Sequence, residues 1–451
     1  MKQMSTYSAK IKYYNNVFKA TVSLYRAAVD FFIFVCLQEW DVFKDLTSSN
    51  KLFMPAMESL TISTKQRPSV KYDFSTAFYK FPCYLRRAAI AEAVGKVLSY
   101  KSNLANWEAA DPAARGLMPS FPRAGYCYPA LYKGNMFLRD GKYFAKIKVF
   151  IRNTWDWLEV ELRKSDVDYI DRHCDDIKQC SPTLQKRGKQ WYLDFVFEHN
   201  IKLNKTDIRE QKILAVDLGI NSACVCSAMQ YDGTVLGRRF CSFPREYDCL
   251  MHKIGHIRRV QMHGSRNVRN LWRYAKGVND DIAVKTANFI MEQALSYDVD
   301  VIVFEHLDLG KKKPGSKKQK LALWKARYVQ DMVAFKAHAR GIRISRVNAW
   351  NTSRLAYDGS GRVLRGKESS KCKSYSICEF QTGKVYNCDL NASYNIGARY
   401  FVREILKSLP VRDRQYAEAK IHGCMKRSTC TLSTLINLSG MLNPSGLSCA
   451  A

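Results

Sequence analysis

The sequence predicts an α+β chain of several domains, in which a β-rich N-terminal domain contains a helical insert and a later domain mixes strands and helices. The 451 residues exceed what one hydrophobic core normally serves, and 47% of them are hydrophobic, enough for more than one core. The spacing of apolar residues is helical over 19–45 and 76–108 and alternates between about 136 and 197. Beyond residue 211, segments with helical spacing and segments with strand-like alternation follow one another.

The N-terminal elements can be taken in order. Residues 1–18 alternate loosely between apolar and polar side chains, which is typical of a strand. Residues 19–45 are rich in Ala, Leu, Phe and Val at helical spacing, and 76–108 carry an apolar stripe opposite basic residues. Prolines then end the helical pattern, and alternation between Met136 and Phe197 predicts several strands. The two helical segments therefore interrupt a β-rich domain that begins at the N-terminus.

The later domain opens with an apolar run, Ile213–Val216, that ends in Asp217 and leads into a three-stranded meander with a tight Asp232-Gly233 turn. The elements that follow are helices over 247–276 and 280–297, a strand over 298–307, a helix over 321–340, a strand over 342–348, an irregular stretch over 351–387 and a helix that begins near Asp389. No internal repeat is evident.

Charge points to a polyanionic partner. The chain has 72 Lys and Arg against 41 Asp and Glu, a formal net charge of +31, which favours nucleic acid and places an anionic membrane surface a distant second. The longest uncharged apolar run, near Phe31–Leu37, is too short to span a bilayer, and the polar, basic start does not resemble a secretory signal. We therefore expect no membrane segment and reduced thiols for the 15 cysteines.

Three carboxylates stand out by position. Asp217 and Glu305 each end an apolar strand, and Asp389 opens a helix. A charge at the end of a buried strand is costly unless it is paired, hydrogen-bonded or bound to a metal. Converging carboxylates suit one or two Mg²⁺ ions, which can activate a water and stabilise the leaving oxygen of an in-line phosphoryl displacement. The constellation predicts phosphodiester hydrolysis without a covalent intermediate.

Each carboxylate taken alone has an ordinary explanation. Asp217 could cap a turn into Gly219, and Asp389 could be a plain helix N-cap. The order of the elements is harder to dismiss: strand with Asp, meander, helices, strand with Glu, helix, strand, helix with Asp. That is the order of an RNase H-like fold.

Three sequence motifs carry a family resemblance. ILAVDLGINSACVCSAMQYDG, VIVFEHLDL and YNCDLNASYNIGARY are similar to the three split motifs of a RuvC-type nuclease. In detail they resemble those of transposon-encoded TnpB proteins and compact type V CRISPR effectors. The basic segment ahead of the second motif, over 266–294, also resembles that family. The resemblance covers roughly 210–405, and the helical insert in a β-rich domain extends it over 1–209.

The resemblance implies a mechanism and partners. Asp217, Glu305 and Asp389 would be the catalytic triad that binds two Mg²⁺ ions. A noncoding guide RNA would pair with one strand of double-stranded target DNA, the protein would read a short flanking motif, and a single RuvC site would cut. The protein would be prokaryotic and cytoplasmic, with no membrane partner. Whether it is a monomer or a homodimer, and whether the guide comes from a transposon end or a CRISPR array, stays open.

The same resemblance implies a division into domains. An N-terminal β-barrel (wedge) domain would carry a helical recognition insert, and a C-terminal RNase H-like (RuvC) domain would carry a small target-binding insert. The expected boundaries are 1–18 and 118–210 for the wedge, 19–117 for the recognition domain, 211–350 and 388–408 for the nuclease, 351–387 for its insert and 409–451 for an unassigned tail.

The small insert departs from the family. Relatives usually place two C-x-x-C pairs there to bind one zinc, whereas this chain has only Cys372, Cys378 and Cys388 and no C-x-x-C pair anywhere. No His lies in 339–421 to supply a fourth ligand. Zinc is therefore doubtful, and we predict a metal-free insert in which Cys388 is a packed thiol.

Basic and aromatic residues suggest nucleic-acid contacts. The candidates for phosphate binding are Arg258, Arg259, Arg266, Arg269, Arg273, Lys276, Lys311, Lys312 and Lys313. The alternative for the helical ones is a solvated helix face. Trp350, Tyr357, Tyr375 and Tyr386 could stack on unpaired bases or form the core of a small subdomain, and the sequence does not separate these two roles.

Three other functions compete with a guided nuclease. A DDE-type transposase or integrase uses the same fold and metals for strand transfer without a guide RNA. A guide-dependent DNA-binding repressor would not need the carboxylates, all of which are present. A general RNA-binding protein explains the charge but not the carboxylates.

Overall fold

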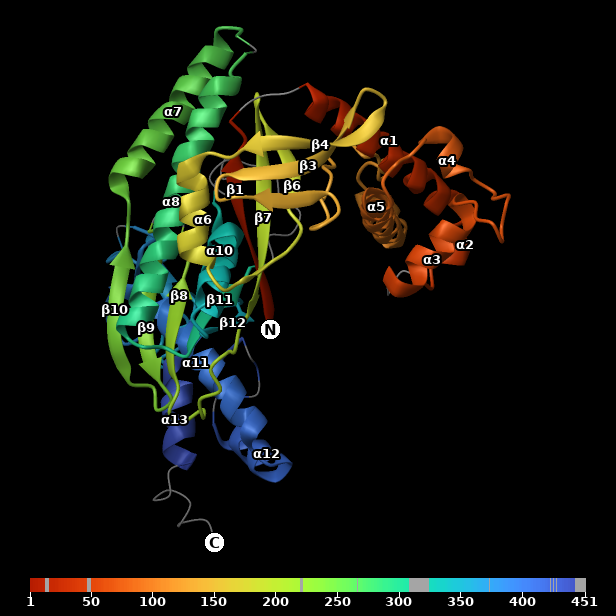
Figure 1. The fold of residues 1–451 in the computed structure, drawn as a ribbon. Coiled ribbons are helices and arrows are strands. Elements are labelled where there is room, and N and C mark those ends of the chain that lie inside the picture. The colour runs from red at the N-terminus through yellow and green to blue at the C-terminus, as the bar shows by residue number, and fades with distance from the viewer. Residues whose placement is uncertain are drawn as a thin grey trace. The chain divides into compact units, whose positions relative to one another are not determined.

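The structure is a computed structural model in which the chain separates into two compact units, Lys2–Asn200 and, together with Met1, Ile201–Ala451. It describes residues 1–12, 16–46, 50–219, 222–265, 267–307, 324–372, 374–421, 423–424, 426 and 428–442. Both units contain helices and sheets, which confirms the α+β class (Figure 1).

The strands of the N-terminal unit form two sheets. One has the order β1-β7-β5, with β6 also paired to β7, and the other has the order β2-β3-β4. The strands are β1 (Lys2–Lys10), β2 (Phe137–Asp140), β3 (Phe144–Ile151), β4 (Thr154–Glu161), β5 (Lys178–Gln179), β6 (Thr183–Arg187) and β7 (Gln190–Asn200). Isolated bridges such as Ile11 to Leu162 link the two sheets, but the pairing of the described strands does not close a barrel. The expected β-barrel is therefore corrected to two sheets, because β1 pairs with β7 along the full length of β1 and β2–β4 form a separate meander.

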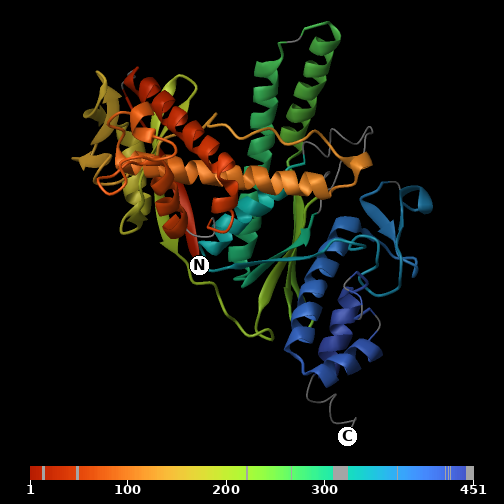
Figure 2. The ribbon, with the colours of Figure 1, turned by 90° about the vertical axis from the view of Figure 1, so that its right-hand side faces the viewer.

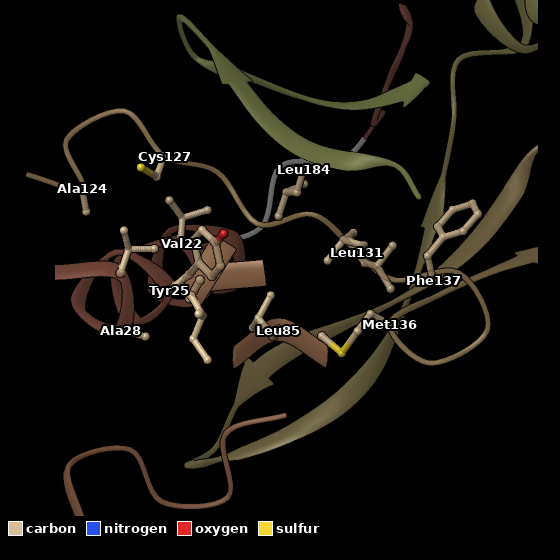
Figure 3. Packing of buried hydrophobic residues seen from close by; sticks show 14 of the residues in the cluster. Val22, Tyr25, Ala28, Leu85, Ala124, Cys127, Leu131, Met136, Phe137 and Leu184 are labelled. Carbon is tan, nitrogen blue, oxygen red and sulfur yellow. The ribbon is translucent and has the colours of Figure 1, made fainter. Parts of the chain in front are cut away.

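Helices fill the interval between β1 and β2. They are α1 (Val17–Gln38), α2 (Trp40–Phe43), α3 (Asn50–Thr61), α4 (Phe74–Ala77), α5 (Cys83–Ala109) and the short η1 (Pro112–Ala114); α6 (Lys164–Cys174) follows β4. Helix α1 packs on α5 and β3. Figure 3 shows Val22 and Tyr25 of α1 beside Leu85 of α5 and Leu131 of the following segment. By length and composition α1 could cross a bilayer, yet half of that stretch is buried inside the unit, as expected for a core helix.

The C-terminal unit is built on a five-stranded sheet of order β10-β9-β8-β11-β12. The strands are β8 (Lys212–Asp217), β9 (Cys224–Gln230), β10 (Val235–Cys241), β11 (Val301–His306) and β12 (Arg343–Asn348). Strands β8, β9 and β10 form the expected antiparallel meander, whereas β11 and β12 run parallel to β8. Parallel neighbours need crossover connections, which are supplied by α7 (Pro244–Met262) and α8 (Arg269–Ser296) before β11 and by α10 (Ala326–His338) before β12.

Helices cover both faces of this sheet. Because side chains alternate along a strand, Leu214 and Val216 of β8 pack toward α8 and α10, whereas Ile213 and Ala215 pack toward α11 (Cys388–Ser408). Helix α13 (Leu432–Leu442) lies beside α11 on that second face (Figure 2), and α12 (Val411–Lys420) lies between them in sequence. The tail, to which the sequence assigned no role, therefore contributes Leu435 and other buried residues to the core.

The irregular segment between β12 and α11 forms a small sheet of its own. It contains β13 (Leu364–Arg365), η2 (Gly366–Glu368), β14 (Ile377–Glu379) and β15 (Val385–Asn387), with strand order β13-β14-β15. Its core consists of Ala356, Val363, Cys378, Phe380 and Cys388.

Candidate active site

The register of the sheet brings Asp217 and Glu305 together. Strand β11 pairs with β8 so that Phe304 lies beside Val216, and the next residue on each strand is Glu305 or Asp217. Phe304 and Val216 face α8 and α10, so alternation turns the two carboxylates to the opposite face, toward α11. The apolar runs that the sequence showed are the strands that fix this arrangement.

Asp389 reaches the same face from the first turn of α11. Asn387 caps this helix by accepting a hydrogen bond from the Leu390 amide at 2.9 Å. The helix lies close on the sheet because Gly397 has no side chain: a Cβ there would stand 2.4 Å from Sδ of Met229 and 3.2 Å from Cβ of Ala215. A glycine at this position therefore helps to set how near Asp389 comes to the strand carboxylates.

Glu305 and Asp389 are near enough to Asp217 to affect its pKa. Burial raises the pKa of Asp217 well above its ordinary value, and the charges of Glu305 and Asp389 raise it further. Burial also raises the pKa of Glu305 and of Asp389. Three acidic groups with raised pKa values in one place form a site whose negative charge nearby cations do not fully offset.

Glu305 has two hydrogen-bond partners and one nearby cation. The Thr352 hydroxyl donates to Oε1 of Glu305, and this bond together with the Arg399 guanidinium opposes the rise in the pKa of Glu305. The backbone carbonyl of Glu305 accepts a bond of 3.0 Å from Nε2 of Gln330 on α10. Thr352, Gln330 and Arg399 are all at least nine-tenths buried.

Sequence reasoning missed Arg365, which the small insert brings to this site. Its guanidinium lowers the pKa of both Asp217 and Asp389. Two of its nitrogens are fixed by insert atoms, Nη1 donating to Oγ of Ser353 at 3.2 Å and Nη2 to the Tyr375 carbonyl at 3.1 Å. Only the fold could reveal this residue, because it lies 24 positions before Asp389 in an irregular stretch.

The donor set fits Mg²⁺ by its chemistry. Carboxylate oxygens are the hard ligands that Mg²⁺ prefers, and their raised pKa values mark negative charge that a cation would stabilise. Among the described residues, however, no three acidic, His or Cys side chains stand close enough together to form a ready-made metal site. Asp217, Glu305 and Asp389 lie on one face of the sheet, but their carboxylates are not close enough together to form a metal site as they stand.

The three cysteines of the insert are buried together. The pKa of the Cys378 thiol is raised by its hydrogen bond with Cys388 and by burial, and Cys372 lies near enough to contribute. Sγ of Cys378 also lies 3.5 Å from the Tyr386 carbonyl, to which it donates. Within the described part of the chain these three cysteines do not form a group that could hold a metal ion, and the metal-free insert remains a prediction.

The described basic candidates line the pair formed by α7 and α8, which runs beyond the sheet in Figures 1 and 2. We call them the hairpin cations: Arg258, Arg259, Arg269, Arg273 and Lys276. All five are exposed, and none forms a salt bridge with a described residue, whereas Lys285 nearer the sheet pairs with Glu246 and Asp281. Arg266 and Lys311–Lys313 lie outside the described residues.

The structure separates the aromatic candidates into two pairs. Tyr357 and Tyr386 pack against each other, with ring centroids 5.2 Å apart, and border the core of the insert. Trp350 and Tyr375 are 70% and 68% exposed, so they alone of the four are free to meet a base.

Comparison with known proteins supports the resemblance over part of the chain. Residues 327–396 match the family model described as Cas12f1-like, TNB domain, which confirms the resemblance to compact type V effectors there. Residues 5–151 match the Aq_aa04 family. An uncharacterized protein, aq_aa04 of Aquifex aeolicus (strain VF5), is 29% identical over 102 residues, which are 22% of this chain and 57% of that protein.

Solved structures of guided effectors are also similar, at low identity. A Cas12f1–sgRNA–target DNA complex aligns at 15% identity over 87% of this chain and 98% of that one, with a TM-score of 0.35. C2c1 of Alicyclobacillus acidoterrestris with single-guide RNA aligns at 11% identity over 85% of this chain and 66% of that one, with a TM-score of 0.43. TM-scores at this level do not by themselves establish a shared fold.

Proposed function

We propose that the protein is an RNA-guided DNA endonuclease that hydrolyses phosphodiester bonds at one RuvC-like site with Mg²⁺. The observation that carries the proposal is the placement of Asp217, Glu305 and Asp389 on one face of the sheet. The strand order, an antiparallel meander with two parallel strands added beside its first strand, agrees with the RNase H-like order of the motifs. The match of residues 327–396 to the Cas12f1-like model supports the guided branch of this fold.

The partners follow from charge and from the relatives. A net charge of +31 suits a guide RNA and a double-stranded DNA target. The similar Cas12f1 and C2c1 structures are named as complexes with guide RNA, the former also with target DNA. The hairpin cations would bind phosphates of these nucleic acids, and Trp350 and Tyr375 would stack on unpaired bases.

The residues of the site divide the chemistry among themselves. Asp217, Glu305 and Asp389 would hold Mg²⁺, which when bound supplies positive charge to the phosphodiester and to the developing leaving oxygen. Arg365 stands beside two of these carboxylates, where its guanidinium can bind a phosphate oxygen in a fixed orientation. The Thr352 hydroxyl binds Glu305, and the charge of Arg399 favours the ionised form of Glu305.

One observation favours a second candidate, a guide-dependent DNA-binding protein that does not cut. The described acidic side chains do not form a ready-made metal cluster. Such a protein would bind guide and target with the same affinity whether or not Mg²⁺ reached the carboxylates.

The test is to express the protein with its native flanking DNA and to sequence the RNA that co-purifies. We expect one discrete RNA with a variable end, and cleavage of a matching DNA duplex in Mg²⁺ but not in EDTA. Guided binding without cleavage would favour the second candidate. Heterogeneous RNA with no guided binding would contradict both and favour the transposase or general RNA-binding alternatives.

A further inference from the structure

A row of buried polar side chains on α11 forms hydrogen bonds with the segment that follows β12. Asn391, Asn395 and Arg399 are spaced four residues apart, so they lie on one face of the helix. All three are buried, the two asparagines completely. A polar stripe of this kind is stable only where every group finds a partner. Here the partners are backbone atoms of two segments, 348–357 from the end of β12 and 428–432 up to the start of α13.

The hydrogen bonds of this stripe are specific. Nδ2 of Asn391 donates to the Leu355 carbonyl at 2.8 Å, and Nδ2 of Asn395 donates to the carbonyls of Thr352 and Leu355, both at 2.9 Å. Nη1 of Arg399 donates to the carbonyl of Trp350 at 2.8 Å. These four bonds fix the backbone on both sides of Thr352.

The side chain held in this way ends at a carboxylate of the candidate active site. The Thr352 hydroxyl donates to Oε1 of Glu305, and Thr352 is 3% exposed, so water does not compete freely for that bond. Glu305 belongs to β11, whereas the stripe belongs to the same helix as Asp389. Thr352 therefore connects the helix that carries one carboxylate to the strand that carries another.

We propose that Thr352 is a positioning residue that orients the Glu305 carboxylate, and that the buried stripe of α11 holds Thr352 in register for this role. The inference rests on the proposed nuclease function. A partner that orients a ligating carboxylate typically changes metal affinity or activity by about 10–100-fold when it is removed. The methyl group of Thr352 contributes packing alone, so the hydroxyl should carry the effect.

The test compares two pairs that differ mainly by the hydroxyl: Thr352 against Thr352→Val, and Thr352→Ser against Thr352→Ala. We expect loss of the hydroxyl to slow guided cleavage about 10–100-fold in both pairs, with target affinity unchanged. We also expect weaker binding of Mn²⁺, measured by its EPR signal on the guide-loaded protein. Thr61→Val is the matched control, because Thr61 is fully buried and donates only to the Met57 carbonyl.

A double-mutant cycle shows whether Thr352 acts through Glu305. In a Glu305→Gln background, Thr352→Val should weaken Mn²⁺ binding no further. Equal Mn²⁺ affinity of Thr352→Val and the unmodified protein would overturn the proposal, as would equal loss in Thr352→Ser and Thr352→Ala or a loss of target binding. If the unmodified protein does not cut a guided target at all, the proposed function fails instead, and the Mn²⁺ comparison still tests the positioning role.

Discussion

The C-terminal unit uses charge in two different ways, at the face shared by the carboxylates and along α7 and α8. At the carboxylates, burial and mutual repulsion raise the pKa of Asp217, and nearby cations such as Arg399 are saturated by hydrogen bonds. The hairpin cations are exposed and lack acidic partners among the described residues. At the carboxylate face the position of each charged group therefore matters, whereas along α7 and α8 the total positive charge matters. Substitutions in the first region should reduce DNA cleavage, and substitutions in the second should reduce DNA binding.

The largest effect is expected at the carboxylates. Asp217→Ala or Asp389→Ala should lower the cleavage rate by about 10³-fold or more, because each removes a group placed to hold the cation that stabilises the transition state. Binding of guide and target should change little, since the site binds few phosphates. Cleavage of a labelled duplex and its affinity by gel shift measure the two quantities. Normal cutting by either variant would contradict the assignment.

A smaller loss of cutting is expected at Arg365. Arg365→Ala should slow cleavage about 10²-fold, whereas Arg365→Lys should recover part of the rate because it keeps the charge but not the planar fork. Arg365 lowers the pKa of Asp217 and Asp389, so its loss should also shift the acidic limb of the rate profile to higher pH. Single-turnover rates across a pH series test both effects. An unshifted profile with a normal rate would place Arg365 outside the site.

The hairpin cations should show the opposite pattern. Replacing all five with Gln should weaken target binding at least about tenfold at physiological salt and reduce the slope of log K against log salt by about 0.7–0.9 for each phosphate that the variant no longer neutralises. The cleavage rate at saturating target should stay within about twofold, because these residues touch no reacting group. Lys285→Gln is the control, since Asp281 and Glu246 raise the pKa of Lys285 to about 12 and occupy its charge. If the slope is unchanged in the fivefold variant, these residues do not bind phosphates and α7 and α8 present an ordinary solvated surface.

The smallest effect is expected on stability. Because burial raises the pKa of Asp217 in the folded protein, the folded state binds more protons than the unfolded state above the ordinary value of 3.8, and stability falls as the pH rises through that window. Asp217→Asn removes this cost and should stabilise the metal-free protein at neutral pH by about 1–3 kcal/mol, with the gain vanishing near the ordinary carboxyl pKa.

Unfolding in EDTA from about pH 4 to pH 8 measures this gain. Asp41→Asn serves as control, because the Asp41 side chain is 95% exposed. Excess Mg²⁺ should make the unmodified protein more stable than Asp217→Asn, because only the unmodified protein keeps the carboxylate that binds the cation. A variant less stable than the unmodified protein at neutral pH would show that the carboxylate already has a stabilising partner.

The fold was predictable where the pattern was regular. Apolar runs ending in Asp217 and Glu305, and a helix opening at Asp389, were visible in the sequence because strand and helix periods are local properties. The α7–α8 boundary and the strands of the insert were not, since short or irregular elements depend on what they pack against. The expected barrel failed for a similar reason: strand patterns do not specify which strands pair.

The carboxylates, the excess of positive charge and the order of the elements that carry them are therefore visible in the sequence. That Asp217 and Glu305 share a face with Asp389 becomes visible only in the folded chain, because it depends on the register between β8 and β11 and on the close approach of α11 at Gly397. The fold alone brought Arg365 and Thr352 to the site, and it divided the aromatic residues into a partly buried pair and an exposed pair. Residues distant in sequence meet through packing and hydrogen bonds that no local pattern encodes.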